Sequence, residues 1–419
     1  MGCAPATVMA TRMRRLLLLP FFFLVACGGE RPPKELPQVS LWHTFGPQAT
    51  ELLNRDLEAI ERQEKLHVRA TVLPFGRARN QVTRTLEESS DPTPSCPDLV
   101  RVDATWVPLL ARAGLLRPLS DEATALQGFT PEAVELVEWS GQRWGLPQAI
   151  EPLALLYDAD TIARAGVAWP PASLTALEEA ARKLTHDGHY GLSVRADGYF
   201  FLAWLRATGA DLPAIDDPAA RAALARYGAL VATGGVAPPA VAGEDEARDE
   251  AERLARREVA IIVGGPFSVV HLGALPFALA VAPFPRDPEG RPAAPRGGHV
   301  YVVPRCAASP ERAIRVAQLL TSPERQVAWS RAITLVPTRT QALAKTEGLA
   351  RGFADAIAAT RPLPREPSTP DLFDDLTPAV EAVLFGEATA DEVLPGVARA
   401  WRRVLARHAR APHPGAKQP

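Results

Sequence analysis

The stretch "VSLWHTF" (residues 39–45) opens the alternation of patterns that decides the fold. Its apolar run is typical of a buried strand, and residues 49–65 follow with apolar side chains three or four positions apart, which is helical spacing. The alternation continues with the strand pattern "LHVRATVLPF" (66–75), the helix pattern "VTRTLEES" (82–89), the strand pattern "PDLVRV" (97–102) and the helix pattern "WVPLLARAGLL" (106–116). This order predicts a doubly wound α/β sheet, whose ligands bind at the carboxyl ends of the strands. We therefore expect the loops 43–47 and 103–106 to line a ligand site.

A second series of elements follows the segment "WGLPQAIEPLALLYD" (144–158). It comprises helix patterns at 173–185, 199–209 and 243–258, and strand patterns at 190–194, 259–265 and 277–285. The alternating charges of 243–258 indicate a solvated helix face. This series predicts a second α/β lobe.

Length and composition agree with two lobes. Without its first 26 residues the 419-residue chain keeps 393, which exceeds the ~250–300 residues at which a single core stops growing. Apolar residues make up 47% of the chain and can fill two cores. The net charge of −2 leaves no electrostatic footprint for nucleic acid.

The first 26 residues have the pattern of an export signal. Arg12, Arg14 and Arg15 precede the apolar run 16–26, which at about 1.5 Å per helical residue is too short to span a membrane. Residues 24–27, "LVAC", resemble a lipobox, in which Cys27 is lipidated and becomes the first residue after cleavage. The alternative is an ordinary secretory peptide with a chance cysteine.

Both ends of the exported chain are polar. Residues 27–38 are rich in proline and charge, as suits a flexible tether, and 411–419 form a tail. Apart from Cys3 and Cys27, the chain has Cys96 and Cys306. Export places this pair in an oxidising compartment, where a disulfide can form.

Seven segments in order resemble the extracellular solute-binding proteins of sugar ABC importers, nearest in pattern to maltose- and trehalose-type binders. They are "VSLWHTF", "PDLVRVDATW" leading to "LLARAGLLRPL", "GLPQAIEPLALLYD", "DGYFFLAWLRATGAD", "REVAIIVGGPFSV", "GGHVYVVPRCAASPERA" and "LVPTRTQAL". The resemblance implies a type II periplasmic-binding-protein fold, with two α/β lobes, a hinge that the chain crosses more than once and a sugar bound between the lobes. It also implies a membrane permease as partner, no cofactor and no catalysis.

The resemblance also implies lobe boundaries and a cysteine pairing. The N-terminal lobe would comprise 39–149 plus 297–347, and the C-terminal lobe 150–296 plus 348–410. The strand after Gly298 would run antiparallel beside "PDLV", which brings Cys306 close to Cys96. A disulfide is expected there; two buried free thiols are the alternative.

Three carboxylates are candidate acceptors for sugar hydroxyls. Glu151 lies in an apolar segment that crosses between the lobes, where an unpaired charge is costly. The resemblance implies that its carboxylate binds sugar hydroxyls. A salt bridge to an arginine is the alternative. Asp103 ends the third strand and could instead cap the next helix. Asp197 precedes Tyr199 at another position that the family uses, and a turn role is its alternative.

Aromatic side chains are candidates to cover the apolar faces of a sugar. Tyr199, Phe267 and Phe373 match positions where the maltose binder places rings, although two of these are Phe here where that relative has Trp. Trp106 and Phe45 lie on first-lobe loops, with an ordinary exposed loop aromatic as the alternative. Trp42 matches a first-strand residue and could equally belong to the core.

The chain departs from the maltose binder at two places. Gly46-Pro47 and Thr105-Trp106 stand where that relative has an Asp-Lys and an Asp-Arg pair, which disfavours maltose itself. Other groups are candidates to compensate: His43, Thr44, Arg101 and the main chain of Gly297 and Gly298. The glycine pair would let backbone approach the ligand.

An enzyme and a binding protein for a different ligand are the alternatives to a sugar-binding protein. The sequence has no HExxH, CxxC, Walker or nucleophile-elbow motif, although Glu151 with Asp103 could imitate a glycosidase pair. His186 and His189 could suggest a metal, but the Asp-Gly between them favours a turn, and we expect no metal. The same fold could instead bind an acidic or phosphorylated sugar, glycerol phosphate or a polyamine, with Arg101 and Arg195 available for a phosphate.

The sequence therefore predicts a lipid-anchored binding protein of the cell membrane, periplasm or cell surface. It would capture a di- or oligosaccharide between its lobes and deliver it to an ABC transporter permease.

Overall fold

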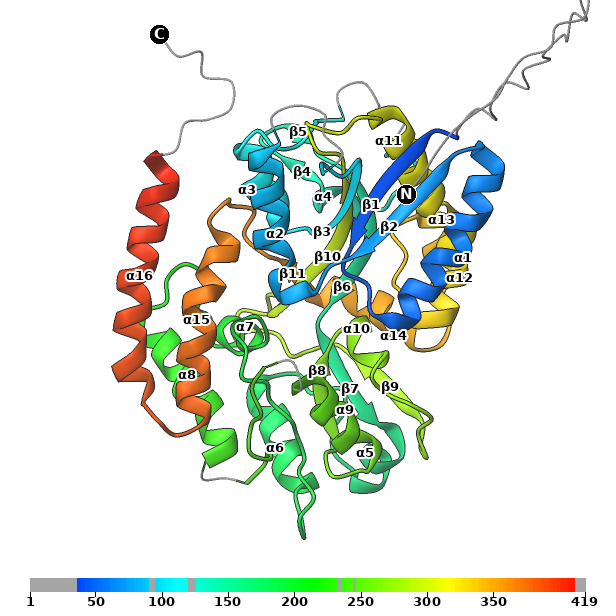
Figure 1. The fold of residues 1–419 in the computed structure, drawn as a ribbon. Coiled ribbons are helices and arrows are strands. Elements are labelled where there is room, and N and C mark those ends of the chain that lie inside the picture. The colour runs from blue at the N-terminus through cyan, green and yellow to red at the C-terminus, as the bar shows by residue number, and fades with distance from the viewer. Residues whose placement is uncertain (1–35, 90–94, 120–125, 233–234, 244–245, 411–419) are drawn as a thin grey trace, which may run out of the picture. The chain divides into compact units, whose positions relative to one another are not determined.

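The computed structural model describes residues 36–89, 95–119, 126–232, 235–243 and 246–410 (Figure 1). Its larger sheet has six strands. The strands are β1 (Gln38–His43), β2 (His67–Val72), β3 (Leu99–Asp103), β6 (Leu146–Pro152), β10 (Ala294–Val302) and β11 (Thr360–Pro362). Their order is β11-β10-β3-β1-β2, and β6, which lies outside this order, also pairs with β10. β1 runs parallel to β2 and β3, whereas β10 runs antiparallel to β3 and β6.

Helices bury their apolar stripes against this sheet. They are α1 (Pro47–Glu64), α2 (Phe75–Glu88), α3 (Trp106–Arg112), α4 (Pro131–Glu135), α11 (Pro310–Leu320), α12 (Pro323–Ile333) and α13 (Thr340–Leu343). Leu53 of α1 and Val82 of α2 join Leu41 and Leu99 of the strands in one hydrophobic cluster, called the first cluster below. Helix α2 begins seven residues earlier than the pattern suggested, since Phe75 is helical directly after Pro74.

The second sheet is small and antiparallel. β7 (Ala154–Asp158) lies between β8 (Ile261–Gly264) and β9 (Leu279–Ala282) and runs opposite to both. The strand expected at 190–194 is not regular: Ala260 N–H donates to the carbonyl of Tyr190 and Ser193 N–H to that of Ile261, without a continuous ladder. Gly191 lies against the helix Leu174–Leu184 (α6), where a Cβ would meet the Ala181 carbonyl at 2.0 Å.

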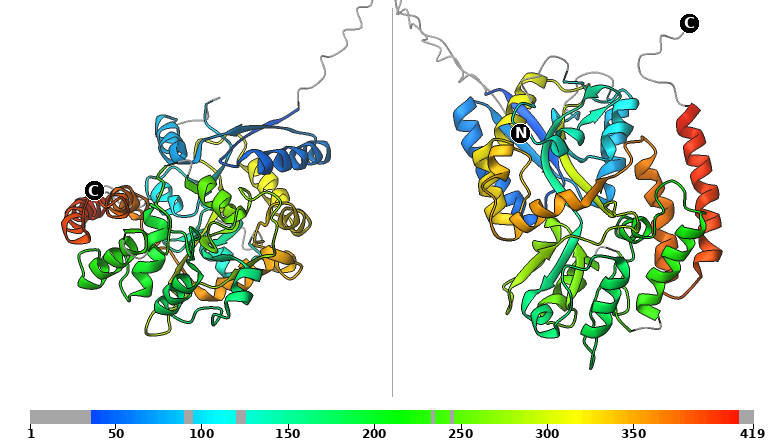
Figure 2. Two further views of the ribbon diagram at one scale, coloured as in Figure 1. Left: turned by 90° about the horizontal axis from the view of Figure 1, so that it is seen from below. Right: turned by 180° about the vertical axis from the view of Figure 1, so that it is seen from behind.

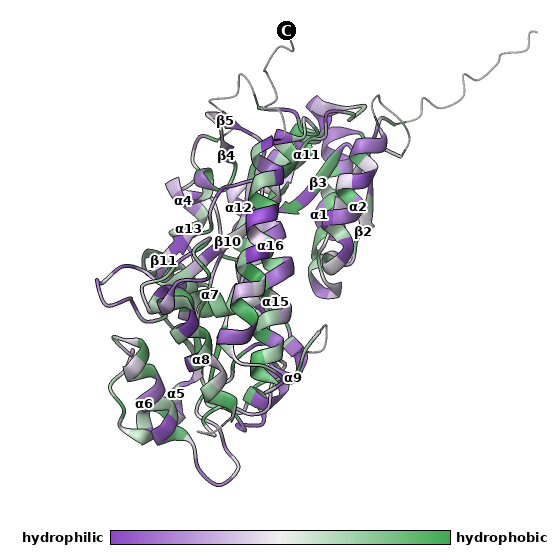
Figure 3. Cartoon of the chain, turned by 90° about the vertical axis from the view of Figure 1, so that its left-hand side faces the viewer, coloured by the Kyte–Doolittle hydropathy of each residue, from purple (hydrophilic) through white to green (hydrophobic). Residues whose placement is uncertain are grey.

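Most of the remaining helices, which surround this sheet, form a second hydrophobic cluster with Trp204, Leu376 and Trp401, whereas three of them contribute Leu254, Phe353 and Ile357 to the first cluster. The remaining helices are α5 (Ala159–Ala165), α6 (Leu174–Leu184), α7 (Gly198–Ala207), α8 (Pro218–Ala232), α9 (Glu246–Ala255), α10 (Pro266–Val269), α14 (Gly348–Ala356), the 3₁₀ turn η1 (Ile357–Ala359), α15 (Thr369–Leu384) and α16 (Ala390–Arg410); a short hairpin, β4 (Glu138–Trp139) and β5 (Gln142–Arg143), completes the fold. Apolar and polar residues alternate along α15 and α16, which lie side by side (Figure 3). Trp401 fixes this pair by donating its indole N–H to the carbonyl of Leu372 at 3.0 Å.

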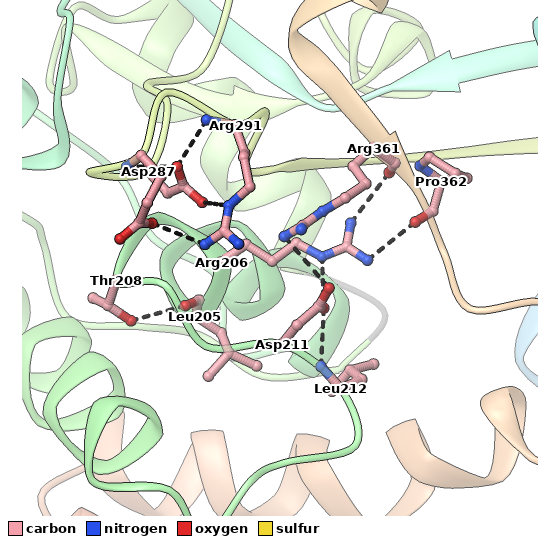
Figure 4. Close-up of polar contacts among 10 residues, drawn as sticks. Leu205, Arg206, Thr208, Asp211, Leu212, Asp287, Arg291, Arg361 and Pro362 are labelled. Atoms are coloured by element: carbon pink, nitrogen blue, oxygen red, sulfur yellow. Dashed lines mark hydrogen bonds and ion pairs between the residues drawn. The ribbon is translucent and has the colours of Figure 1, made fainter.

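The chain passes between the two sheets at adjoining places (Figure 2). Only Leu153 separates the end of β6 from the start of β7, and its N–H donates to the Pro295 carbonyl of β10 at 3.1 Å. Arg206 at the end of α7 is buried and donates to the carbonyls of Arg361 and Pro362 in β11 (Figure 4). This is a two-lobed α/β fold whose lobes are connected through neighbouring segments.

A disulfide joins Cys96 to Cys306, with 6.1 Å between their Cα atoms. Cys96 precedes β3 and Cys306 follows β10, and these strands pair antiparallel. The expected signal peptide 1–26, Cys27 and the tail 411–419 lie outside the described residues. Among the described residues, no helix combines the length and apolar character needed to cross a bilayer.

Candidate functional site

One face of the larger sheet gathers polar side chains near its contact with the second lobe. In the strand register, His299 lies opposite Asp103, Tyr301 opposite Arg101, and Gly297 opposite Glu151. Partner residues in neighbouring strands point to the same face, and side chains two apart in a strand share a face. The face therefore carries a row of ionisable groups in an otherwise apolar sheet.

Glu151 is the centre of this row. Nδ1 of His299 lies 3.1 and 3.0 Å from its two carboxylate oxygens, and Nη2 of Arg101 lies 4.0 Å away. Burial favours the protonated carboxyl, but the charge and hydrogen bond of His299 and the charge of Arg101 outweigh it, so the pKa of Glu151 is lowered. The side chain is 14% exposed and ionised at neutral pH.

Arg101 is held from several sides. Its Nε donates to Gln148 Oε1 at 3.0 Å, its Nη1 donates to Thr44 Oγ1 at 2.9 Å, and its guanidinium lies 3.9 Å from the centre of the Phe45 ring. Burial lowers the pKa of Arg101 to about 10, which leaves it charged. Phe45 is buried against Trp329, with ring centres 5.1 Å apart. Thr44 and Phe45 thus support Arg101 rather than line an open loop.

His43 and Trp42 lie on opposite faces of β1, because successive side chains alternate. His43 is 1% exposed, and its Nδ1 accepts the N–H of Phe45 at 3.3 Å. Burial, with the charge of Arg101, lowers the pKa of His43 to about 4, so it is neutral. Trp42 lies in register with Val100, on the face away from His299 and Glu151, and packs against the first cluster.

Both aspartates make local bonds, but not the ones that their alternatives named: Asp103 bonds a turn and does not cap α3, whereas Asp197 caps a helix. Oδ1 of Asp103 accepts the N–H of Thr105 at 2.8 Å and its hydroxyl at 2.5 Å. Asp197 caps α7 by accepting the N–H of Tyr199 at 2.7 Å, and burial raises the pKa of Asp197. Asp103 therefore stabilises the turn before α3, and Asp197 stabilises the start of α7.

Aromatic rings of the second lobe approach Glu151. The Tyr199 ring centre lies 6.3 Å from that of Phe373, and Phe267 joins the group through Phe200. Burial, with the charges of Glu151 and Asp103, raises the pKa of the Tyr199 hydroxyl, which therefore stays protonated. The structure thus places Tyr199 near Glu151, with Phe373 next to Tyr199 and Phe267 next to Phe200.

The two glycines of β10 have different neighbours. A Cβ on Gly297 would lie 3.3 Å from the Tyr199 hydroxyl, whereas a Cβ on Gly298 would lie 2.4 Å from the Ala149 carbonyl oxygen and 2.6 Å from Leu136. Gly297 therefore faces the candidate site, and Gly298 is required by strand packing.

Two residues at the site, His299 and Phe75, were not predicted from the sequence. His299 directly follows the glycine pair in "GGHVYVVP", and the only signal was this adjacency. Phe75, which the pattern predicts at the end of a strand, is the first residue of α2 and is 53% exposed. The centre of its ring lies 6.0 Å from that of His299 and 5.9 Å from that of Trp106. Trp106, expected on a loop, is 6% exposed. Phe75 is thus the exposed member of the pair.

Two cavities lie elsewhere, in the second lobe. One of about 10 Å³ is lined by Arg195, Glu246 and Glu250, and another of about 440 Å³ by Asp158, Arg164 and Arg257 together with both histidines of the 186–189 turn. In that turn Asp187 and Gly188 have φ of 41° and 81°, as an Asp-Gly hairpin requires. Within the described ranges, no three His, Cys, Asp or Glu side chains are grouped to hold a metal.

A two-lobed α/β scaffold with a carboxylate and aromatic rings where the lobes meet defines a class of small-solute binding proteins. The model of the family described as bacterial extracellular solute-binding protein matches residues 58–357. The chain belongs to this family, which confirms the resemblance inferred from the seven segments.

Solved structures share the fold over nearly their whole length. The GacH receptor of Streptomyces glaucescens, described with acarbose and an acarbose homologue, is 26% identical, with 88% of this chain and 99% of that chain covered and a TM-score of 0.78. An ABC transporter solute-binding protein of Thermotoga lettingae bound to α-D-tagatose is 25% identical, with 88% and 100% covered and a TM-score of 0.73.

A maltotriose-binding protein of Pyrococcus abyssi is 30% identical over 133 residues, which are 29% of this chain and 28% of that protein. The match therefore spans less than a third of that relative.

Proposed function

We propose that the protein captures a neutral sugar between its lobes and delivers it to the permease of an ABC transporter. The observation that carries this proposal is the ionised carboxylate of Glu151, which His299 fixes near Tyr199, whose ring in turn lies next to Phe373. A carboxylate accepts hydroxyl protons, each such bond contributing about 1.5–3 kcal/mol, and aromatic rings cover the apolar sugar faces. The ligands named for the GacH receptor and the Thermotoga protein are consistent with it.

The charges near the site favour a neutral ligand over a phosphorylated one. Arg101 already bonds Gln148 and Thr44, and Arg195 donates to Glu250 at 2.8 Å. A phosphate would have to replace these bonds, and the carboxylate of Glu151 would repel it. A glycerophosphocholine-bound UgpB of Mycobacterium tuberculosis shares the fold at 19% identity. Phosphorylated and cationic ligands are therefore included in the binding experiment below.

Capture would proceed by closure. Ligand bound to one lobe recruits the other, and the closed form is favoured only by the contacts that both lobes make with the ligand. The moving bodies would be 39–149 plus 297–347 and 150–296 plus 348–410. The protein binds its ligand and releases it unchanged to the permease.

Export and lipidation of Cys27 belong to the same proposal. Several acyl chains on one cysteine would hold the protein at a membrane, where a single chain binds only marginally. Expression of the full chain with a radiolabelled or alkyne-tagged fatty acid should label the wild type in the membrane fraction. Cys27→Ala should lose the label, and a label retained by this variant would refute the anchor.

The ligand is tested by thermal shift and calorimetry on the chain from Gly28. The panel contains mono-, di- and trisaccharides, sugar phosphates, glycerol phosphate and polyamines, tried on wild type, Glu151→Gln and Glu151→Ala. A ligand at 100 times its Kd stabilises by about 2.7 kcal/mol. We expect a shift with a neutral sugar that Glu151→Gln abolishes, while the variant keeps a cooperative melting transition of its own that shows it is folded. Shifts only with phosphates or amines would overturn the sugar proposal.

A further inference from the structure

Phe75 leaves much of an apolar aromatic ring in contact with water, which costs free energy. Among the described residues, five large apolar side chains are notably exposed: Leu36, Val72, Phe75, Val270 and Phe385. Phe75 is 53% exposed, and its ring lies 6.0 Å, centre to centre, from His299, the residue that holds Glu151. It therefore borders the candidate site.

The ring of Phe75 is supported from below. It packs on Trp106 with ring centres 5.9 Å apart and planes inclined by 31°, and it meets His299 edge-on at 62°. Trp106 is buried and fixed in the first cluster. A rigid buried ring and a bonded imidazole thus hold an exposed ring in place.

The same face of α2 is turned toward the second lobe. Arg79 lies one helical turn after Phe75, and residues four apart share a face. Its Nη2 lies 2.5 Å from Asp374 Oδ2, and its Nη1 lies 3.8 Å from Asp371 Oδ1. Asp371 and Asp374 flank Phe373 on α15. Phe75 and Phe373 therefore stand on facing elements of the two lobes.

We propose that Phe75 is an aromatic platform for a second sugar ring, next to the ring that bonds Glu151. The inference rests on the proposed function and deepens it, because it makes the substrate class a di- or oligosaccharide. A ring that donates hydroxyls to Glu151 occupies the space near His299. The adjoining ring lays its apolar C–H face on Phe75, which removes apolar surface of both from water.

Calorimetry with glucose, maltose, trehalose and maltotriose tests this subsite on wild type, Phe75→Ala, Phe75→Tyr and Phe385→Ala. Phe75→Ala should weaken binding of the di- and trisaccharides by about tenfold and leave any glucose binding unchanged. Phe75→Tyr keeps the ring and should stay within about twofold of the wild type. Phe385→Ala is the matched control, since Phe385 is 42% exposed at the other end of α15 from Phe373.

The outcomes separate the subsite from the function. If the wild type binds sugars and Phe75→Ala changes no affinity, or changes that for glucose as much as that for longer sugars, the platform is refuted and sugar capture stands. If the wild type binds only phosphates or amines, both proposals fail. Melting temperatures of the Phe75 variants near that of the wild type show that a loss of affinity is not a loss of folding.

Discussion

At the scale of single residues, the pairing of His299 with Glu151 decides the charge in the site. Burial alone would raise the pKa of the carboxyl, and the imidazole together with Arg101 lowers it below the ordinary value. Nδ1 contacts both carboxylate oxygens, so it also sets the direction of the carboxylate. His299 therefore acts on a ligand through Glu151, as a positioning residue.

Replacing His299 should shift the pH dependence of ligand affinity. The lowered pKa of Glu151 means that its contribution is complete above its ordinary value of 4.5 and is lost as pH falls through the lower pKa of the folded protein. In His299→Leu that pKa rises, so affinity should be lost at a higher pH and should be about tenfold weaker at neutral pH. Calorimetry across the acidic to neutral range measures this.

His299→Asn is the matched variant for this experiment, since its amide offers an N–H near the position of Nδ1. It should recover most of the affinity at neutral pH. Identical pH profiles for wild type and His299→Leu would show that the imidazole does not govern Glu151.

At the scale of elements, strand β10 contains two adjacent glycines with different structural roles. Gly297 and Gly298 lie on opposite faces because strand side chains alternate. Gly298 is in contact with the backbone of β6 through Ala149, which cannot move without breaking the ladder, whereas the atom nearest to a Cβ on Gly297 would be the hydroxyl of the Tyr199 side chain. One strand thus serves packing on one face and the candidate site on the other.

Alanine at the two positions should therefore act differently. Gly298→Ala should lower the free energy of unfolding by about 1–3 kcal/mol, because overpacking displaces backbone. Gly297→Ala should cost less than about 1 kcal/mol, since the Tyr199 side chain can shift, but should weaken ligand binding. Urea denaturation and calorimetry distinguish the two variants. Equal destabilisation would show that the Ala149 contact is not limiting.

At the scale of the whole molecule, an ion pair joins elements of the two lobes. Arg79 belongs to α2, which packs into the first cluster, and Asp374 belongs to α15, which packs into the second. On the same side, Arg112 of α3 donates to the carbonyl of His408 in α16 at 2.8 Å. These contacts join elements of the two lobes directly.

Loss of the ion pair should favour the open form modestly. Asp374 is 60% exposed, and a solvated pair contributes about 0.2–1 kcal/mol, so Arg79→Ala should raise the open-to-closed ratio at most about fivefold. X-ray scattering of the unliganded protein should give a larger radius of gyration for this variant, and for the wild type in high salt.

Arg351→Ala is the control for that measurement, because Arg351 pairs at 2.8 Å with Asp355 inside one helix. Its scattering should match that of the wild type. An unchanged radius for Arg79→Ala at every salt concentration would mean that the pair does not restrain the lobes.

The sequence by itself determined the elements and several members of the site. Apolar spacing is a local property, and it predicted β1, α1, β3, α3 and α7 within a few residues. The apolar setting of Glu151 marked it as a charge in need of partners, and the order of the seven segments identified the family.

Only the tertiary structure decided which groups meet. His299 is 148 residues from Glu151 and Asp374 is 295 from Arg79, and no local period records such contacts. The same holds for exposure: Trp106 is covered and Phe75 is open because α2 begins at Phe75 and lays its ring on Trp106. The hydrophobic pattern can be determined from the sequence alone, whereas the burial of a side chain and the pairing of its charge depend on neighbours that folding brings together.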